Sequence, residues 1–363
     1  MKYSDLTRQQ ILSLPVYQPG KPIELVAREM GLPLDSIIKL ASNENPLGSP
    51  ACAVEAVRTA AENMALYPDN SGYALVDALA DKHGFSPGQI TLGAGSNEIF
   101  YLLCDVFAGP GTEVLVGEYA FISYRISALL TGAKVVAAPM PGLCHDLDAM
   151  RDAVTDKTRL VFLPNPNNPT GTGLPVKEVE AFARSLPEWV IFCYDEAYAE
   201  YEDERLDVQG LIDDGIKVIG TRTFSKIYGL AGLRIGYGFS HPDLAELLNR
   251  VRPPFNTGTL SQVAAVAALG DDAWVERSRA SNEQGRTQLT EGLRDLGVET
   301  AGDRGNFILF ALENAGAATH KFQELGVIVR PLAGYGLPRH LRVTIGTEEE
   351  NQQFLEALQK VVS

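Results

Sequence analysis

The sequence predicts an α/β fold, with a large domain built on a mostly parallel central sheet covered by helices on both faces, and a smaller α+β domain. Short apolar segments without polar alternation recur along the first two thirds of the chain, as expected for strands buried on both faces. Segments with apolar residues at helical spacing separate them, which is the pattern of parallel β-α-β units. Beyond about residue 241 this regular alternation ends.

Length and charge indicate the broad class of protein. The 363 residues exceed the usual length of one domain, and we assign residues 50–240 to the large domain and residues 1–49 with 241–363 to the small one. Lysine and arginine number 31 against 46 acidic residues, which gives a net charge of −15. Such a surface repels nucleic acid and anionic membranes, so neither is expected as a partner.

Other features of the composition bear on compartment and metals. No apolar run approaches the length of a membrane span, and the first residues lack the apolar stretch of a signal peptide. A cytoplasmic location is therefore expected. The four cysteines and five histidines show no ligand spacing, so we expect neither a disulfide framework nor a metal site.

The N-terminal segment should be mostly irregular. One short helix is expected over residues 7–14, and the prolines of residues 15–22 require an extended chain. A short strand then leads into a polar turn over residues 39–48. A helix should follow over residues 50–64, with Ser49 as its N-cap and a proline at the first helical position.

Strands and helices should then alternate through the large domain. The predicted strands are residues 90–93, 114–116, 134–138, 160–163, 190–194, 216–220 and 235–239. The predicted helices are residues 73–83, 95–107, 121–130, 146–154 and 176–185. In the small domain we expect helices at residues 243–249, 259–269, 273–296, 315–325 and 348–362, and strands at 307–310, 327–330 and 341–345.

The stretch 223–236 has the clearest chemical pattern. Lys226 follows a buried apolar strand, and a side chain at such a strand end faces the crevice where α/β sheets hold ligands. Lysine forms Schiff bases with carbonyl compounds. The hydroxyls of Thr223 and Ser225 and the guanidinium of Arg234 can hold a phosphate dianion. An aldehyde and a phosphate together indicate pyridoxal phosphate, whereas the lysine taken alone favours a solvated loop residue.

Polar residues follow three other predicted strands. Asn168 lies in a turn rich in proline and asparagine, which can aim an amide into the crevice. Asp195 follows a buried run and needs a partner; paired with a pyridinium nitrogen, it would let the ring act as an electron sink, and Tyr198 could bond the ring hydroxyl. Ser96 and Asn97 begin a helix after a glycine turn, where backbone N–H groups attract anions. Each feature alone also has a purely structural explanation.

Together these stretches resemble the fold type I pyridoxal-phosphate-dependent aminotransferases over essentially the whole chain. Within that group the sequence is most similar to the histidinol-phosphate aminotransferase subfamily. The matching stretches are ASNENPLG (41–48), YPD (67–69), GAGSNE (93–98), NPNNPTG (165–171), DEAY (195–198), TFSKIYGLAGLR (223–234), GYGLP (334–338) and LRVTIG (341–346).

The resemblance implies a role for each residue that contacts the cofactor. Lys226 would form the Schiff base and then carry the proton during transamination. Asp195 would pair with the ring nitrogen, while Asn168 and Tyr198 would hold the ring hydroxyl. The phosphate would be held by Ser96, Asn97, Thr223, Ser225 and Arg234.

Two aromatic residues also have implied roles. In the family, a tyrosine at the position of Tyr67 crosses from the neighbouring subunit to the phosphate, which implies a homodimer with shared active sites. Phe121 falls where the family stacks an aromatic ring on the cofactor. Here Tyr119 and Ala120 replace the Pro-Thr pair common before that ring, and an ordinary core phenylalanine is the alternative.

On the substrate side, Arg342 matches the arginine that binds the α-carboxylate of the amino-acid partner, and Arg330 matches the arginine implicated in holding the phosphate of histidinol phosphate. Tyr17 and Asn43 match further substrate-side positions. The implied enzyme moves an amino group between histidinol phosphate and 2-oxoglutarate in histidine biosynthesis. An aromatic amino-acid aminotransferase shares every catalytic residue and is the closest alternative. A decarboxylase on the same scaffold and a catalytically silent binding protein or regulator are further alternatives.

Overall fold

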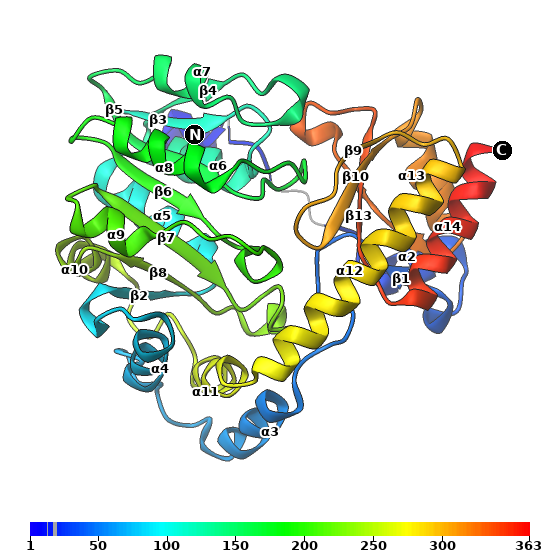
Figure 1. The fold of residues 1–363 in the computed structure, drawn as a ribbon, viewed down its shortest axis with the longest axis horizontal. Helices are drawn as coiled ribbons and strands as arrows, with labels where there is room; N and C mark the ends of the chain where they lie inside the picture. Colours follow the sequence, from blue (N-terminus) through cyan, green and yellow to red (C-terminus); the bar gives the residue numbers. More distant parts are fainter. Residues whose placement is uncertain (13, 17–19) are drawn as a thin grey trace.

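The computed structural model describes residues 1–12, 14–16 and 20–363, which form two sheets with their covering helices (Figure 1). The larger sheet has seven strands in the order β2-β8-β7-β6-β5-β3-β4. Only β8 runs antiparallel to its neighbours, so the other six strands share one direction. The strands are β2 (Ile90–Gly93), β3 (Glu113–Gly117), β4 (Lys134–Ala138), β5 (Thr158–Pro164), β6 (Ile191–Asp195), β7 (Val218–Thr223) and β8 (Gly236–Ser240).

Helices cover both faces of this sheet because alternate strand residues point to opposite sides. In β5, Leu160 and Phe162 pack into one apolar cluster with α5 (Ser96–Phe107), α6 (Ile122–Thr131) and α10 (Pro242–Val251). Val161 and Leu163 pack into a second cluster on the other face. The helices of that face are α4 (Tyr73–His83), α7 (Leu147–Asp152), α8 (Val176–Ser185), α9 (Val208–Asp213) and α11 (Thr259–Leu269). This arrangement confirms the predicted α/β fold.

The smaller sheet is antiparallel, in the order β12-β13-β10-β9, and packs against long helices at the right of Figure 1. Its strands are β9 (Thr300–Gly302), β10 (Phe307–Ala311), β12 (Arg330–Pro331) and β13 (His340–Thr344). The covering helices are α12 (Asp272–Asp295), α13 (Ala315–Glu324) and α14 (Glu348–Val362). The N-terminal segment joins this part, since β1 (Ile38–Lys39) pairs with β11 (Val327–Ile328) and α2 (Ile23–Met30) lies beside α13.

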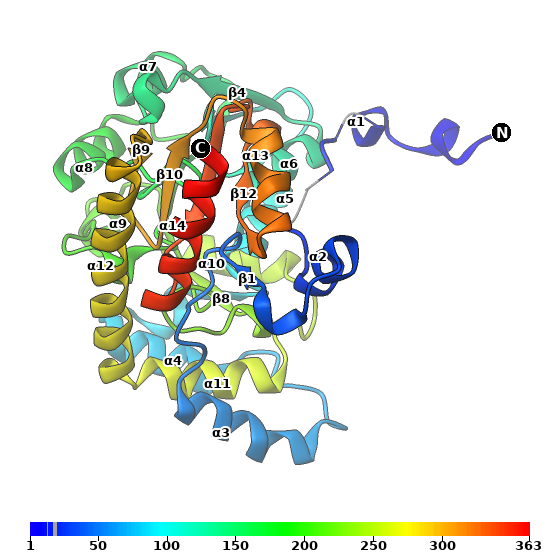
Figure 2. The same cartoon turned by 90° about the vertical axis from the view of Figure 1, so that its right-hand side faces the viewer.

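The division into domains at residue 241 stays a prediction. Helices α10 and α11 follow that residue, yet α10 packs against α5, and α11 packs against α4 and α3 (Ala51–Ala60). At the other end of the chain, α1 (Gln9–Leu12) contacts α6, and the residues before it extend away from the body of the molecule (Figure 2).

Several predicted elements differ from those observed. Ser49 is not an N-cap, because its hydroxyl donates to Gly229 O at 2.7 Å and the extended Pro50 precedes α3. The helix ends at Ala60, before a short 3-10 turn. The strand predicted over residues 327–330 is two strands, because β11 pairs with β1 and β12 pairs with β13. Helices α2 and α9 were not predicted.

Within the described ranges, no helix is both long enough and apolar enough to cross a membrane. The same ranges contain no cluster of three or more histidine, cysteine, aspartate or glutamate side chains placed to hold a metal ion. All four cysteines are free thiols. The cytoplasmic location remains a prediction.

Candidate active site

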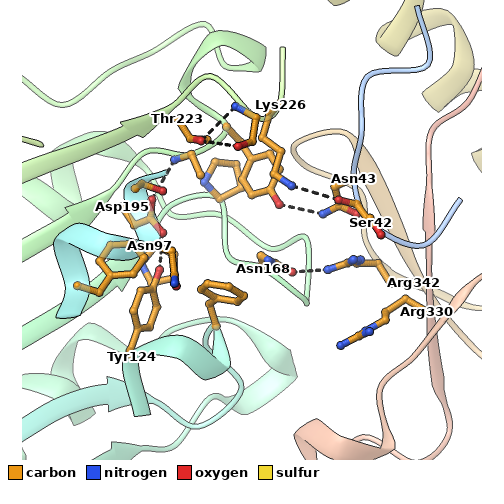
Figure 3. A pocket seen from close by; sticks show the side chains of 18 of the residues that line it. Ser42, Asn43, Asn97, Tyr124, Asn168, Asp195, Thr223, Lys226, Arg330 and Arg342 are labelled. Atoms are coloured by element: carbon orange, nitrogen blue, oxygen red, sulfur yellow. Dashed lines mark hydrogen bonds between the residues drawn. The ribbon is translucent and has the colours of Figure 1, made fainter. Parts of the chain in front are cut away.

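A cavity of about 180 Å³ lies where the carboxyl ends of the parallel strands face the smaller sheet (Figure 3). This is the position at which open α/β sheets bind ligands. Most of the residues singled out from the sequence line it: Asn43, Ser96, Asn97, Phe121, Asn168, Asp195, Tyr198, Thr223, Ser225, Lys226, Arg234, Arg330 and Arg342. Tyr67 does not line it, and Tyr17 lies outside the described residues.

Lys226 enters the cavity from the loop that follows β7. Its neighbours Phe224 and Ile227 are fully buried, which fixes the loop in the core. Lys226 Nζ donates to Ser42 O at 3.2 Å and lies 5.9 Å from the centre of the Tyr198 ring. Burial, reinforced by nearby arginines, lowers the pKa of Lys226 to about 7. A substantial fraction of this amine is therefore uncharged near neutral pH, as a nucleophile or base requires.

Asp195 is the last residue of β6, and its carboxylate is buried. Tyr124 Oη donates to Asp195 Oδ2 at 2.5 Å, while Thr221 Oγ1 and Ala197 N donate to Oδ1 at 3.2 and 3.1 Å. Burial raises the pKa of Asp195 to about 6, and the three hydrogen bonds oppose that rise. The carboxylate is thus held in a fixed orientation in a poorly solvated place.

The first turn of α5 and the loop after β7 form a cluster of anion-binding groups. Thr223 Oγ1 donates to Ser225 Oγ at 3.0 Å, and Arg234 Nη1 donates to the same oxygen at 3.2 Å. A Cβ on Gly95 would lie 2.6 Å from Arg234 Nη2, so a side chain at this position would displace the guanidinium from the helix start. Arg234 itself has a φ of +51°, a strained conformation typical of functional sites.

Ser96 and Asn97 complete this cluster at the N-terminus of α5, where backbone N–H groups lack helical partners. Asn97 Oδ1 is buried without a hydrogen-bond partner. Hydroxyl, amide and guanidinium donors therefore converge beside a helix N-terminus, an arrangement that suits a phosphate group.

Two arginines form the opposite wall. Arg330 in β12 and Arg342 in β13 are direct cross-strand partners, and each is more than nine-tenths buried. Arg342 donates to Asn168 Oδ1 at 2.5 Å and to Ala41 O at 2.8 Å. Like charges placed opposite each other destabilise a sheet. Their joint presence makes this wall of the cavity positively charged, which favours an anionic ligand.

Asn43 connects the N-terminal segment to the large sheet. Its Nδ2 donates to Tyr198 Oη at 2.8 Å, and its φ of +56° is again left-handed. Burial raises the pKa of Tyr198 to about 12, so the phenol keeps its proton at neutral pH. Asn43 and Tyr198 therefore fix one side of the cavity.

Phe121 and Tyr67, the two aromatic residues singled out from the sequence, lie in different places, one at the cavity and the other at the surface. Phe121 directly precedes α6, lines the cavity and contacts the Tyr124 ring edge-on at 5.8 Å. Tyr67 is 82% exposed and stacks on Phe255 at 4.7 Å between ring centres. Within one chain, Tyr67 therefore belongs to the surface.

Sequence reasoning missed Tyr124, Thr221 and the carbonyl of Ser42. The first has a recognisable signal, because Tyr124 lies three residues after Phe121 and so shares a helix face with the residue that was singled out. The other two could not have been found, since their roles depend on which strands become neighbours.

The sequence model of the family described as "Aminotransferase class I and II" matches residues 35–358. Proteins named histidinol-phosphate aminotransferase 1 are similar over nearly their whole length: that of Dechloromonas aromatica is 45% identical and covers 100% of both chains, and that of Thiobacillus denitrificans is 46% identical over 97% of this chain and 92% of its own.

Solved structures give the same result. Histidinol-phosphate aminotransferase from Sinorhizobium meliloti, in complex with pyridoxal-5'-phosphate, superposes with a TM-score of 0.89 at 28% identity, over 98% of this chain and 97% of that one. A single mutant of aspartate aminotransferase from Thermus thermophilus superposes with a TM-score of 0.83 at 25% identity, over 98% of this chain and 99% of that one.

Proposed function

The chain belongs to the class I and II aminotransferases, and we propose that it is a pyridoxal-phosphate-dependent enzyme that transfers the amino group of histidinol phosphate to 2-oxoglutarate in histidine biosynthesis. The observation that carries the proposal is that Lys226 and Asp195 line one cavity together with a cluster of groups suited to a phosphate. The similarity to histidinol-phosphate aminotransferases along the whole chain supports the choice of substrate.

The residues of the cavity fit pyridoxal phosphate. The missing side chain at Gly95 leaves space beside the Arg234 guanidinium at the start of α5. We propose that the phosphate is held there, and that Asn168 and Tyr198 hold the ring hydroxyl. When bound, the cofactor supplies an aldehyde that condenses with amines and a ring that accepts the electron pair released at the substrate carbon.

The chain's own residues perform the remaining tasks. Lys226 Nζ, uncharged in a large fraction of molecules near neutral pH, is the group that attacks a carbonyl carbon and later moves the proton. Asp195 provides the negative charge that keeps a ring nitrogen protonated. Phe121 provides an apolar surface on which the ring can stack.

Substrate recognition falls to the arginine pair. Histidinol phosphate carries a phosphate, and 2-oxoglutarate carries two carboxylates, so both substrates bring anions to the wall formed by Arg330 and Arg342. We propose that Arg342 binds the α-carboxylate of the acceptor and that Arg330 binds the phosphate of the donor. Asn43 would contact the substrate from the N-terminal segment. An aromatic amino-acid substrate would leave Arg330 without a phosphate.

Replacing Arg330 with alanine should reduce kcat/KM for histidinol phosphate by about 100-fold, the usual cost of removing one partner of a buried charged contact. The loss for phenylalanine should be much smaller. Steady-state rates with the two donors measure the difference. Arg339→Ala is the matched control, because Arg339 is exposed outside the cavity and its removal should change neither rate. Equal losses for both donors in Arg330→Ala would favour the aromatic aminotransferase.

We propose further that the enzyme is a homodimer in which Tyr67 reaches the partner's phosphate. Other exposed apolar side chains lie close to Tyr67 in the sequence, including Met64, Leu66 and Tyr73. Its stacking partner Phe255 has a φ of +57°, a strained conformation for a bulky residue. A surface of this kind suits a contact between subunits.

Mixing two impaired variants tests the shared site. In a hybrid of Lys226→Ala and Tyr67→Ala subunits, one site combines both defects and the other is intact. Refolding the variants together should therefore restore about a quarter of the wild-type activity, if subunits pair at random in symmetric dimers. Each variant refolded alone is the control. No gain on mixing would show that Tyr67 serves its own subunit.

A further inference from the structure

The hydroxyl of Tyr124 points at the carboxylate of Asp195 in the wall of the cavity (Figure 3). We propose that Tyr124 is a positioning residue that holds Asp195 in its anionic form, so that the proton between Asp195 and the cofactor ring stays on the ring nitrogen. This inference rests on the proposed function and adds a residue to it.

Aromatic side chains pack against the ring of Tyr124, while its hydroxyl donates to Asp195. The side chain is fully buried, with its ring stacked on Phe162 at 4.8 Å and an interplanar angle of 7°. Phe100 contacts it edge-on at 4.8 Å. These rings fix the tyrosine but accept no conventional hydrogen bond. The phenol oxygen lies 2.5 Å from Asp195 Oδ2, the short distance expected when a hydroxyl donates to a carboxylate.

The start of α6 carries two residues that would act on the cofactor ring. Phe121 and Tyr124 are three residues apart at the start of α6 and meet edge-on at 5.8 Å. Phe121 lines the cavity where the ring would stack, and Tyr124 supports the residue that would meet the ring nitrogen. The start of α6 therefore provides both the surface on which the ring would stack and the hydrogen-bond donor to the carboxylate that would pair with the ring nitrogen.

The charges around Asp195 explain why a donor is needed. Burial favours the protonated acid, and the neighbouring Glu196 carboxylate adds to this effect, whereas Tyr124, Thr221 and the backbone N–H of Ala197 favour the anion. Lys226, Tyr198 and Cys193 are the other titratable groups that act on this pair. Each donor lowers the proton affinity of the carboxylate and so leaves the shared proton on the nitrogen. Burial raises the pKa of Tyr124 well above its usual value, so the phenol remains a donor at neutral pH.

The test uses holoenzyme loaded with pyridoxal phosphate labelled with ¹⁵N in the ring. In Tyr124→Phe, the ¹⁵N chemical shift should move from the pyridinium value towards that of neutral pyridine, with the ratio of the two forms changing roughly tenfold, as expected for one lost hydrogen bond to a charged group. We also expect kcat to fall by a similar factor while KM for 2-oxoglutarate is retained.

Tyr194→Phe is the matched control. Tyr194 lies next to Asp195 in sequence and is equally buried, but its hydroxyl accepts from Asn165 at 3.2 Å on the opposite face of the sheet. This variant should keep the wild-type ¹⁵N shift and kcat. A wild-type shift in Tyr124→Phe, or the same change in both variants, would overturn the proposal.

A measurement on the apoprotein tests the proposal for a variant that binds the cofactor poorly. Infrared titration of the Asp195 carboxyl should show a higher pKa in Tyr124→Phe than in wild type, and an unchanged pKa would overturn the proposal even if the variant binds cofactor poorly. Wild-type protein that binds no pyridoxal phosphate and shows no transamination would instead refute the proposed function. The carboxyl titration would then still decide whether Tyr124 stabilises the anion.

Discussion

Replacing Lys226 with alanine is expected to lower kcat for transamination by about 10⁴-fold or more, because a single side chain supplies both the nucleophile and the proton carrier. Among the described residues, Lys226 is the only lysine that lines the cavity. The measurement is the steady-state rate together with the visible absorption band of the bound cofactor, which borohydride should abolish in wild type. The variant should fold normally, because Phe224 and Ile227 anchor the loop independently of the lysine.

The control for this variant is Lys217→Ala, since Lys217 is exposed just before the other end of β7. A small amine added to Lys226→Ala should restore part of the activity by replacing the missing group. Retained turnover in Lys226→Ala would refute the assignment of the lysine.

The protonation of Lys226 gives the same prediction a pH dependence. The pKa of about 7 means that the amine gains a proton as the pH falls below neutral and ceases to be a nucleophile. The rate at which apoprotein takes up the cofactor should therefore rise as the pH increases through about 7. A rate that stays constant across this range would contradict the lowered pKa.

Helices with a continuous apolar face could be predicted from the sequence with little error. The predicted bounds of α4, α8, α11 and α14 agree with the structure, because the spacing of apolar residues is a property of the segment itself. The pairing of strands is not local. The reversed direction of β8 and the break between β11 and β12 depend on which distant strands become neighbours.

The candidate site follows the same distinction. Asp195, Thr223 and Asn168 could be brought together from sequence, because the carboxyl ends of parallel strands meet along one edge of a sheet. Tyr124 could be found only as a neighbour of Phe121 on one helix face. Its contact with Asp195, 71 positions away, depends on how that helix packs on the sheet. The cross-strand pairing of Arg330 with Arg342 likewise depends on the register of β12 and β13.

Replacing Asp195 with asparagine should lower kcat on the order of 10³-fold, in the range found when a preorganised electrostatic group is removed. Asparagine keeps the shape and can still accept from Tyr124, but it cannot hold a proton on a ring nitrogen. The variant should also make the apoprotein more stable than wild type above pH 6, whereas a substitution that damages the fold would make it less stable.

The direction follows from the pKa of Asp195. Burial raises it from 3.8 to about 6, so the native state binds this proton more tightly than the unfolded chain does. Wild-type apoprotein therefore loses stability through this group as the pH rises from about 4 to 6, and asparagine removes the loss. Above pH 6 the Asp195→Asn apoprotein should have a higher Tm than wild type, with the difference disappearing below about pH 4.

Glu196→Gln is the control for the measurements of kcat and Tm on Asp195→Asn. Glu196 adjoins Asp195 but forms a buried ion pair with Arg222 at 3.1 Å on the opposite face. Its neutralisation should lower the Tm, because Arg222 would be left buried without its counter-charge. Adjacent carboxylates should thus have opposite effects on stability, since one is paired within the chain and the other is kept for a ligand. A lower Tm for Asp195→Asn at neutral pH would show that Asp195 serves the fold and would remove the basis for its role at the ring nitrogen.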